Sequence, residues 1–193
     1  MDAKRADRAF APEMDRASRD LAVIAEVGRS LIGIIDLDQQ LEQILTIAIE
    51  ALEGDRGSIM LADDSARQLE VRSGVGLPAR AEGATSAFGE GIAGWVAEHR
   101  QPVVLHGDVS DPRFEGRDSS IGSALSLPLI VDESLLGVLN LVRSAGDRFT
   151  DEDLRLASSL ADMSSLAIEK SQLHSALKER EARVTQLLAA AIG

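Results

Sequence analysis

Apolar residues recur along this chain with different periods, and each period predicts a different kind of element. In the N-terminal part, spacings of three and four residues predict one face of a helix, formed by Leu21, Ile24, Gly28, Leu31 and Ile35. This periodicity begins near Pro12, after a polar terminus that we expect to fray, and breaks at Gly33. We therefore expect a flexible terminus over residues 1–16 and a helix over residues 17–37.

A second helix is predicted over residues 39–53, with Asp38 as its N-cap and Gly54 after its end. Its apolar face consists of Leu41, Ile44, Leu45, Ala48 and Leu52. Alternation with a period of two then replaces the helical spacing and predicts β-strands. Residues 56–61 and 68–73 are expected to form one antiparallel hairpin.

A second hairpin is predicted from residues 123–131 and 134–143, around Asp132 and Glu133. Pro128 lies inside its first strand and cannot donate to a ladder, so we expect it at an edge or a bulge. Between the hairpins the sequence predicts a loop over residues 74–86 and a short helix over residues 91–100, stopped by Pro102. A short strand over residues 103–105 and a polar loop over residues 107–120 are expected to follow.

The longest helical pattern runs from Thr150, a predicted cap, to about Ala190. Spacings of four and three alternate along its second half, which predicts the seam of a coiled coil. The seam consists of Leu166, Lys170, Leu173, Leu177, Arg180, Val184, Leu187 and Ala191. Charged side chains such as Lys170 and Arg180 are tolerated there when they reach solvent, and they also weaken the seam, as a switchable dimer requires.

Composition limits the classes of function. Apolar residues make up 45% of the 193 residues, enough for the core of one domain with extensions. The formal net charge is −12, and Lys and Arg are interspersed with Asp and Glu throughout. Such a chain repels phosphate backbones and anionic lipid surfaces, so we expect neither nucleic-acid binding nor membrane contact by this chain.

The chain has no cysteine, which excludes disulfides, thiolate metal sites, cysteine nucleophiles and chromophores bound through a thioether. We expect a cytoplasmic protein, because the N-terminus lacks the apolar segment of a signal peptide. No apolar run approaches the roughly 20 residues that span a bilayer. If the parent protein is bound to a membrane, we expect its anchor outside this chain.

Two features, a glycine-rich run and the histidines, suggest a cofactor or metal site, and each has a structural explanation that is favoured over it. The run from Gly89 to Gly94 matches the GxGxxG dinucleotide fingerprint, but the residues before it form a poor strand and the helix after it is short. We expect these glycines to allow a sharp turn and a close approach, while the first amides of the helix remain candidates for binding a polar or anionic ligand. No histidine constellation for a metal is predicted; a single axial haem ligand, His99 or His106, is the sharper alternative. No catalytic residue is predicted.

The order of elements and a set of local motifs resemble the GAF domain, a sensory module of bacterial signalling proteins. The matching segments are residues 55–58, 89–96, 102–103, 111–114, 127–129, 136–139 and 149–154. The resemblance implies a six-stranded antiparallel sheet with helices on one face and a ligand pocket on the other. It also implies parallel homodimers, with residues 38–168 as the sensory domain, 17–37 as a signalling helix and 169–193 as a coiled-coil linker.

In this family the ligand lies between the sheet and the segments around the short helix. The candidate contacts are therefore Ser58, Phe88, Gly91, Ile92, Trp95, His99, Phe114, Ser123, Leu125 and Asn140, with Val96, Ser126 and Leu127 beside them. For two of these candidates a structural role is favoured over ligand contact: Trp95 as part of the core, and Phe114 as the anchor of the Asp111-Pro112 turn. The expected dimer residues are Leu21, Ile24, Leu31, Leu166, Leu173, Leu177, Val184 and Leu187.

Departures from the family pattern reduce the set of ligand classes that we expect this chain to bind. Cyclic-nucleotide-binding members carry an Asn-Lys…Phe…Asp-Glu motif, of which Asn140, Phe149, Asp151 and Glu152 remain, but Leu141 stands where Lys is expected. We therefore expect weak or absent binding of cyclic nucleotides, no covalent bilin and no retained haem; the cofactor is unknown. The predicted function is a non-enzymatic sensory and dimerisation domain that acts on an effector outside this chain. The alternative is a ligand-free scaffold that only sets dimer geometry.

Overall fold

The computed structural model describes the chain apart from residues 1–2, 31–35, 79–80, 107–121, 145–147 and 193. Its helices are α1 (Ala3–Ser30), α2 (Leu37–Ala51), α3 (Gly91–His99) and α4 (Asp151–Ile192). Its strands are β1 (Arg56–Asp63), β2 (Gln68–Val75), β3 (Thr85–Ala87), β4 (Val103–His106), β5 (Ser123–Val131) and β6 (Ser134–Arg143). They form one antiparallel sheet in the order β3-β2-β1-β6-β5-β4, which confirms the predicted α+β fold.

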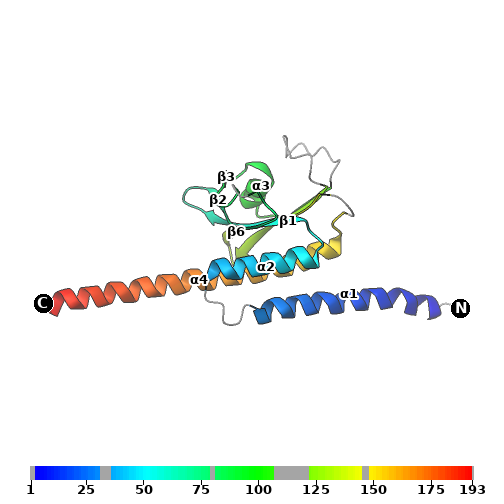
Figure 1. The fold of residues 1–193 in the computed structure, drawn as a ribbon, viewed down its shortest axis with the longest axis horizontal. Helices are drawn as coiled ribbons and strands as arrows, with labels where there is room; N and C mark the ends of the chain where they lie inside the picture. The colour runs from blue at the N-terminus through cyan, green and yellow to red at the C-terminus, as the bar shows by residue number, and fades with distance from the viewer. Residues whose placement is uncertain (1–2, 31–35, 79–80, 107–121, 145–147, 193) are drawn as a thin grey trace.

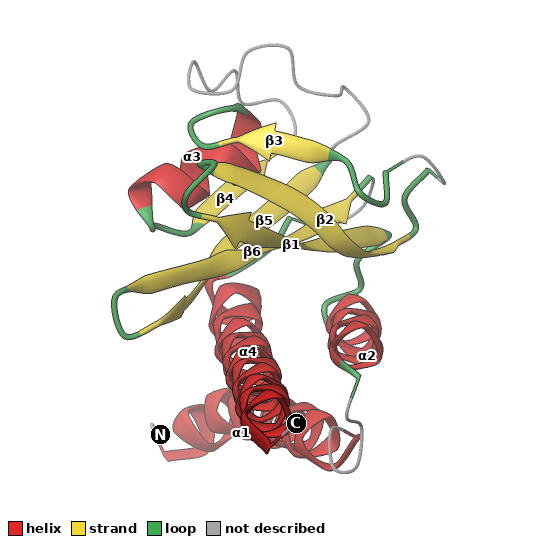
Figure 2. Cartoon of the chain, turned by 90° about the vertical axis from the view of Figure 1, so that its left-hand side faces the viewer, coloured by secondary structure: helices red, strands yellow, loops and turns green. Residues whose placement is uncertain are grey.

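The helices lie on both faces of the sheet in unequal layers. Figure 2 shows α3 on one face and α2 and α4 on the other, with α1 in a further layer beyond them. The α1 helix packs on α2 and α4. In this layering α2 and α4 lie between the sheet and α1.

The α1 and α4 helices run parallel. Arg16 Nη2 of α1 lies 2.9 Å from Asp153 Oδ1 of α4, and further along both helices a Cβ at Gly28 would lie 3.9 Å from Met163 Cε. Sequence position thus increases in the same direction along both. Figure 1 shows the two termini at opposite ends of the molecule, with the second half of α4 projecting beyond the sheet.

The main core lies between the sheet and α2, α4 and α1; we call it the helix-side core. The helical spacing of α2 and the period-two spacing of the strands bury one face of each element there. Its fully buried side chains include Val27, Leu41, Ile44, Leu45, Ile59, Leu125, Leu129, Leu139, Leu141, Leu160 and Ile168. This burial supplies most of the apolar area that stabilises the fold.

A smaller cluster lies on the opposite face, under α3; we call it the α3-side cluster. Its buried members are Met60, Leu69, Val71, Val96, Ala97, Val103, Leu105, Ala124, Leu135 and Val138. Met60 follows Ile59 in β1, and Val138 precedes Leu139 in β6, so neighbouring residues of one strand serve the two clusters. This is the alternation expected of a sheet buried on both faces.

Several predicted elements are confirmed. The second hairpin has the predicted bounds, and α3 occupies the predicted short helix. Thr150 and Asp153 form a reciprocal cap, in which the Thr150 amide donates to Asp153 Oδ2 (2.8 Å) and the Asp153 amide to Thr150 Oγ1 (3.2 Å). The ladder from β5 to β4 ends at Ser126, so Pro128 pairs with β6 alone, as its missing N–H requires.

Three predictions about element boundaries were wrong. The α1 helix begins at Ala3 and passes Pro12, because the Ala- and Arg-rich start favours helix strongly enough to carry a proline. The N-cap of α2 is Asp36 instead of Asp38, since the Asp36 carboxylate accepts from the Gln39 amide at 3.0 Å. A strand, β3, overlaps the end of the segment predicted as a loop, residues 74–86, and forms through pairing with β2. Residues 31–35 and 107–121 lie outside the described part.

The end of α2 places a non-glycine residue in a left-handed conformation. Glu53 has φ 49°, its amide donates to the Glu50 carbonyl, and the Gly54 amide donates to the Ile49 carbonyl at 2.8 Å. This is the Schellman arrangement, which usually carries glycine at the residue with positive φ. Glu53 therefore bears conformational strain at the boundary between α2 and the sheet.

Glu53→Gly is expected to raise the free energy of unfolding by about 1 kcal/mol, because glycine adopts positive φ without a Cβ penalty. Denaturant titration followed by circular dichroism measures the effect. Glu53→Ala is the matched control: it removes the same carboxylate but keeps a Cβ, so it should gain no such stability. Equal behaviour of the two variants would show that Glu53 is not strained.

Candidate functional site

A row of polar side chains crosses the face of the sheet that carries α3. Ser126 Oγ of β5 donates to Asn140 Oδ1 of β6 at 2.7 Å, and Asn140 Nδ2 donates to Ser58 Oγ of β1 at 3.2 Å. The three residues face one another across adjacent strands. They share the face of the α3-side cluster, since Met60, Ala124 and Val138, each two residues away along its own strand, belong to that cluster. We call Ser58, Ser126 and Asn140 the polar row.

Hydroxyls and a carboxamide give the polar row both donors and acceptors without a net charge. Ser126 and Ser58 are buried, and Asn140 is half-buried. A row of this kind suits a neutral ligand edge that both donates and accepts hydrogen bonds. The sequence-based candidates Ser58, Ser126 and Asn140 are thus brought together.

The α3 helix is held close to the sheet by glycine. A Cβ at Gly94 would lie 2.2 Å from the Ala87 carbonyl oxygen, so no larger residue fits without movement of α3. Gly91, at the start of α3, has φ 62°. These roles explain the GxGxxG pattern, and the antiparallel sheet lacks the parallel βαβ unit of a dinucleotide site.

Aromatic side chains cover the α3 side. The Trp95 and His99 rings stack with centroids 4.1 Å apart, and His99 Nδ1 donates to the Trp95 carbonyl at 2.9 Å. The Arg67 guanidinium lies over the Phe88 ring at 5.1 Å and pairs with Glu98 of α3. Ile92, Trp95 and Phe88 are half-buried against the α3-side cluster.

The structure places other predicted contacts elsewhere. Leu125 and Leu127 belong to the helix-side core, one residue out of phase with Ser126. Ser123 lies on that side too: its hydroxyl donates to the Leu105 carbonyl (2.9 Å) and accepts from the Phe149 amide (3.2 Å). These three residues therefore do not line the surface that Trp95 covers. Phe114 lies outside the described residues.

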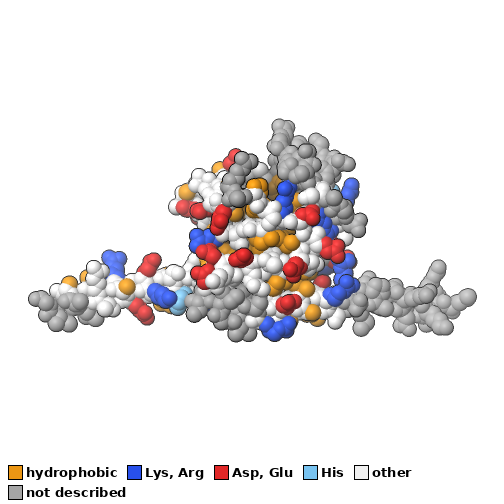
Figure 3. Space-filling model, in the orientation of Figure 1, with side chains coloured by type: hydrophobic (Ala, Val, Ile, Leu, Met, Phe, Trp, Pro, Cys, Tyr) orange, Lys and Arg blue, Asp and Glu red, His pale blue; other side chains and the backbone are white. Residues whose placement is uncertain are grey.

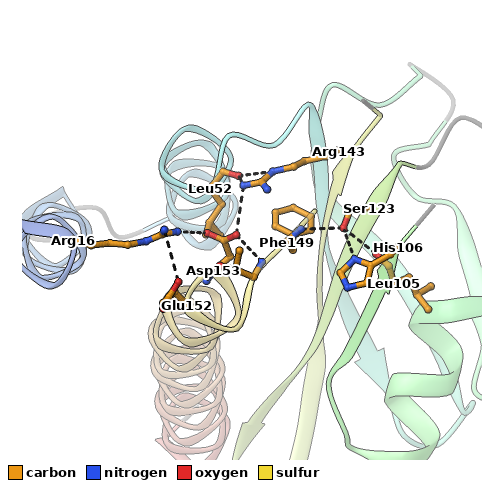
Figure 4. Close-up of polar contacts among 10 residues, drawn as sticks. Arg16, Leu52, Leu105, His106, Ser123, Arg143, Phe149, Glu152 and Asp153 are labelled. Carbon is orange, nitrogen blue, oxygen red and sulfur yellow. Dashed lines mark hydrogen bonds and ion pairs between the residues drawn. The ribbon is translucent and has the colours of Figure 1, made fainter. Parts of the chain in front are cut away.

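A charged junction joins the sheet to all three helices of the other face (Figure 4). Arg143, the last residue of β6, donates through Nε and Nη2 to the Leu52 carbonyl at the end of α2, and its guanidinium stacks over Phe149 at 4.1 Å. Arg143 Nη2 lies 3.8 Å from Asp153 Oδ2 of α4, and Arg16 of α1 pairs with Asp153. We call Arg143, Asp153 and Arg16 the junction.

Of the junction, the sequence predicted Asp153 alone, as part of the cap of α4; Arg143 and Arg16 were not predicted. Arg143 is the one available signal, because its charge ends an otherwise apolar strand, Leu135 to Val142, interrupted only by Gly137 and Asn140. Its partners are distant in sequence, and Leu52 lies 91 positions away. Only the fold brings them together.

Two charged contacts hold the β1–β2 hairpin. Hydrogen bonds from the Ser65 hydroxyl and the Ala66 and Ser65 amides lower the pKa of Asp63, so this stabilisation is present above the ordinary carboxyl pKa and is lost as the pH falls. Arg72 donates to Asp38 Oδ2 of α2 at 2.8 Å, and this carboxylate raises the pKa of Arg72. The hairpin is thereby fastened to α2.

Most predicted dimer residues are exposed. Figure 3 shows apolar side chains along the projecting part of α4, and mixed acidic and basic side chains over the body. The exposed fractions are Leu21 67%, Leu166 60%, Leu173 60%, Leu177 61%, Val184 49% and Leu187 64%. Ile24 instead packs against the helix-side core, and Leu31 lies outside the described residues.

The described residues also bear on metal sites and on membrane-spanning helices. In that part of the chain no three His, Asp or Glu side chains are placed to share a metal ion. His99 and His106 lie on different faces of the sheet, His106 beside Ser123. Within the same residues, none of the helices has the length and apolarity needed to cross a bilayer.

Comparisons with known proteins agree with this architecture. A Nif-specific regulatory protein of Herbaspirillum seropedicae is 26% identical over 172 residues, which cover 80% of this chain and 32% of that protein. A dual 3′,5′-cyclic-AMP and -GMP phosphodiesterase 11A of Takifugu rubripes is 26% identical over 180 residues, which cover 84% of this chain and 20% of that protein. This chain thus spans a third or less of the length of these relatives.

The fold has close structural counterparts. The GAF domain of a phosphoenolpyruvate-protein phosphotransferase from Coxiella burnetii superposes with a TM-score of 0.76 at 24% identity, covering 83% of this chain and 98% of that domain. The family model of the GAF domain matches residues 36–168, which include the whole sheet, α2, α3 and the polar row. The chain therefore belongs to the GAF domain family.

Proposed function

We propose that this chain is the sensory and dimerisation domain of a bacterial signalling protein, which converts an event on the α3 side into a change in the packing of α1 and α4. GAF domains are sensory modules, and the similarity to a Nif-specific regulatory protein supports a bacterial regulatory setting. The effector would lie in the remainder of a longer protein, and the cytoplasm is the proposed location.

One strand carries the argument for coupling. Asn140 and Arg143 both belong to β6, with Asn140 in the polar row and Arg143 in the junction. A ligand that displaces Asn140 from Ser58 or Ser126 would shift β6 along or across the sheet. Arg143 would move with the strand, and its contacts to Leu52 and Asp153 would transmit the shift to α2 and α4. Arg16 would extend it to α1.

We propose binding without catalysis at this site. The polar row offers two hydroxyls and one amide, which recognise a ligand and do not act as general acids or bases near neutral pH. A small, neutral or weakly polar molecule fits this chemistry. Cyclic nucleotides fit it less well, because their phosphate needs a cationic partner.

Native mass spectrometry tests the proposal. Wild-type protein should retain a small molecule that denaturation releases, and Asn140→Leu should lose it because the polar row is broken. Ser134→Ala, an exposed change at the start of the same strand, is the control and should keep the ligand.

Trp95, the single tryptophan, should show no saturable emission change with cyclic GMP or cyclic AMP up to millimolar concentration.

The second candidate function is a ligand-free scaffold that sets dimer geometry. Complete burial of Leu69, Val96 and Val138 by the protein's own side chains favours it, because the α3-side cluster needs no ligand to be closed. Identical native and denatured masses for wild type would support the scaffold. A released molecule that persists in Asn140→Leu would place the ligand elsewhere.

A further inference from the structure

The second half of α4 projects from the body of the single chain. The described side chains from Gln172 to Leu187 are exposed, whereas the first half of α4 packs on the sheet and α2. A helix that stands free in water is marginal at this length, so tertiary or intersubunit packing must stabilise it. Its apolar side chains, with Arg180 among them, lie at alternating spacings of four and three, the repeat that a second helix covers.

The apolar stripe begins where α2 meets α4. Gln40 of α2 and Leu166, Leu173 and Leu177 of α4 line an open groove of about 570 Å³. In heptad terms, Leu166, Leu173, Arg180 and Leu187 occupy d positions, and Lys170, Leu177 and Val184 occupy a positions. Two of these seven layers are therefore cationic.

We propose that Lys170 and Arg180 select one pairing of this stripe, a parallel, in-register coil with a second copy of the chain. This inference rests on the dimer in the proposed function and adds the residues that fix its register. In such a coil each a side chain packs beside a g residue of the other helix, and each d side chain beside an e residue. Glu169 occupies g and Glu181 occupies e.

Charge complementarity follows from these positions. Lys170 lies beside Glu169 of the partner subunit, and Arg180 beside Glu181 of the partner subunit. In the in-register coil each seam residue packs against the same residue of the second helix. The two Lys170 side chains and the two Arg180 side chains therefore each have two carboxylates beside them, and each leucine or valine of the seam packs against the same apolar residue. Polar seam residues that find partners in only one register specify that register.

Other pairings lose this match. A shift by one heptad places Lys170 against Leu177 of the partner subunit and Arg180 against Leu173 or Leu187 of the partner subunit. An antiparallel coil places Lys170 against Arg180 or Leu187 of the partner subunit. Each of these arrangements buries a cation against an apolar side chain or another cation, which is unfavourable.

Disulfide trapping tests the register, because the chain has no cysteine of its own. Leu166→Cys and Leu173→Cys should each cross-link to itself. In an equilibrated mixture of the two, the mixed disulfide should be at least about tenfold rarer than the two self-linked species. In a Lys170→Leu, Arg180→Leu background the mixed species should rise. A mixed species that dominates without those changes would overturn the proposal.

Charge reversal tests the pairing itself. Glu181→Lys should raise the dimer dissociation constant about tenfold or more, because Arg180 then meets a cation. Glu179→Lys makes the same charge change at an outward c position and should change the constant by less than about twofold. Combining Arg180→Glu with Glu181→Lys should restore dimerisation. Sedimentation over a concentration series measures all four proteins.

These measurements distinguish a failure of the dimer from a failure of its register. A wild-type monomer at tens of micromolar would overturn both the proposed dimer and its register. A wild-type dimer for which Glu181→Lys and Glu179→Lys behave alike would overturn the register alone. A dimer that is weakened only by Glu181→Lys and rescued by the exchange supports both.

Discussion

Arg143→Met is expected to lower the free energy of unfolding by about 3 kcal/mol, since the Leu52 carbonyl loses the charge-assisted donors of Arg143, and the buried Asp153 loses one cationic partner while it keeps Arg16. The Arg143 side chain is only 10% exposed, and it donates to the Leu52 carbonyl and stacks on Phe149. Methionine keeps much of the volume but none of the donors. Denaturant titration followed by circular dichroism measures the loss.

Arg155→Met is the matched control for Arg143. Arg155 is 71% exposed and pairs with Glu152 at 3.5 Å within the same helix. Exposed pairs contribute little, so its loss should cost less than about 0.5 kcal/mol. Hydrogen exchange should also rise at the end of α2 and the start of α4 in Arg143→Met. Equal costs for the two variants would show that the junction does not hold the helices to the sheet.

Gly137→Ala is expected to destabilise the sheet by about 3 kcal/mol or more, because overpacking within a central strand forces the backbone apart. A Cβ at Gly137 would lie 2.1 Å from the Met60 carbonyl oxygen, in the ladder between β6 and β1. No rotation of a side chain relieves a clash with backbone. The midpoint of denaturant unfolding and the soluble yield measure the effect.

Gly54→Ala is the control for Gly137. Its nearest atom, the Val142 carbonyl oxygen, lies 3.6 Å from the added Cβ, which is an ordinary contact. This variant should therefore stay within about 1 kcal/mol of wild type. A Gly137→Ala protein as stable as Gly54→Ala would mean that β1 and β6 are further apart than the structure has them.

Both large effects fall on β6, and this has a functional meaning. The strand contacts β1 and β5, contributes Asn140 to the polar row, and ends in Arg143. Gly137 fixes how closely β6 approaches β1. A strand held this closely moves as a unit, which is what the proposed coupling between the two faces requires.

Local sequence determined much of the fold. The bounds of the β5–β6 hairpin follow from alternation around Asp132 and Glu133, and the cap of α4 follows from Thr150 and Asp153, because partners in these features lie within a few residues. The heptad pattern of α4 is likewise visible in the sequence. The resemblance to the GAF family also gave Ser58, Ser126 and Asn140 as candidate contacts, although it did not predict that they bond to one another across the sheet.

Tertiary structure decided the rest. The three residues of β3 are too few to show a period, so only pairing with β2 defines that strand. Leu125 and Ser126 are neighbours in β5, so their side chains point to opposite faces of the sheet. Which of the two faces α3 depends on where the helices pack. Arg143 meets Leu52, and Arg16 meets Asp153, only because the sheet and three helices converge at one corner. The first pair is separated by 91 positions in the sequence and the second by 137, and contacts over such separations leave no local pattern.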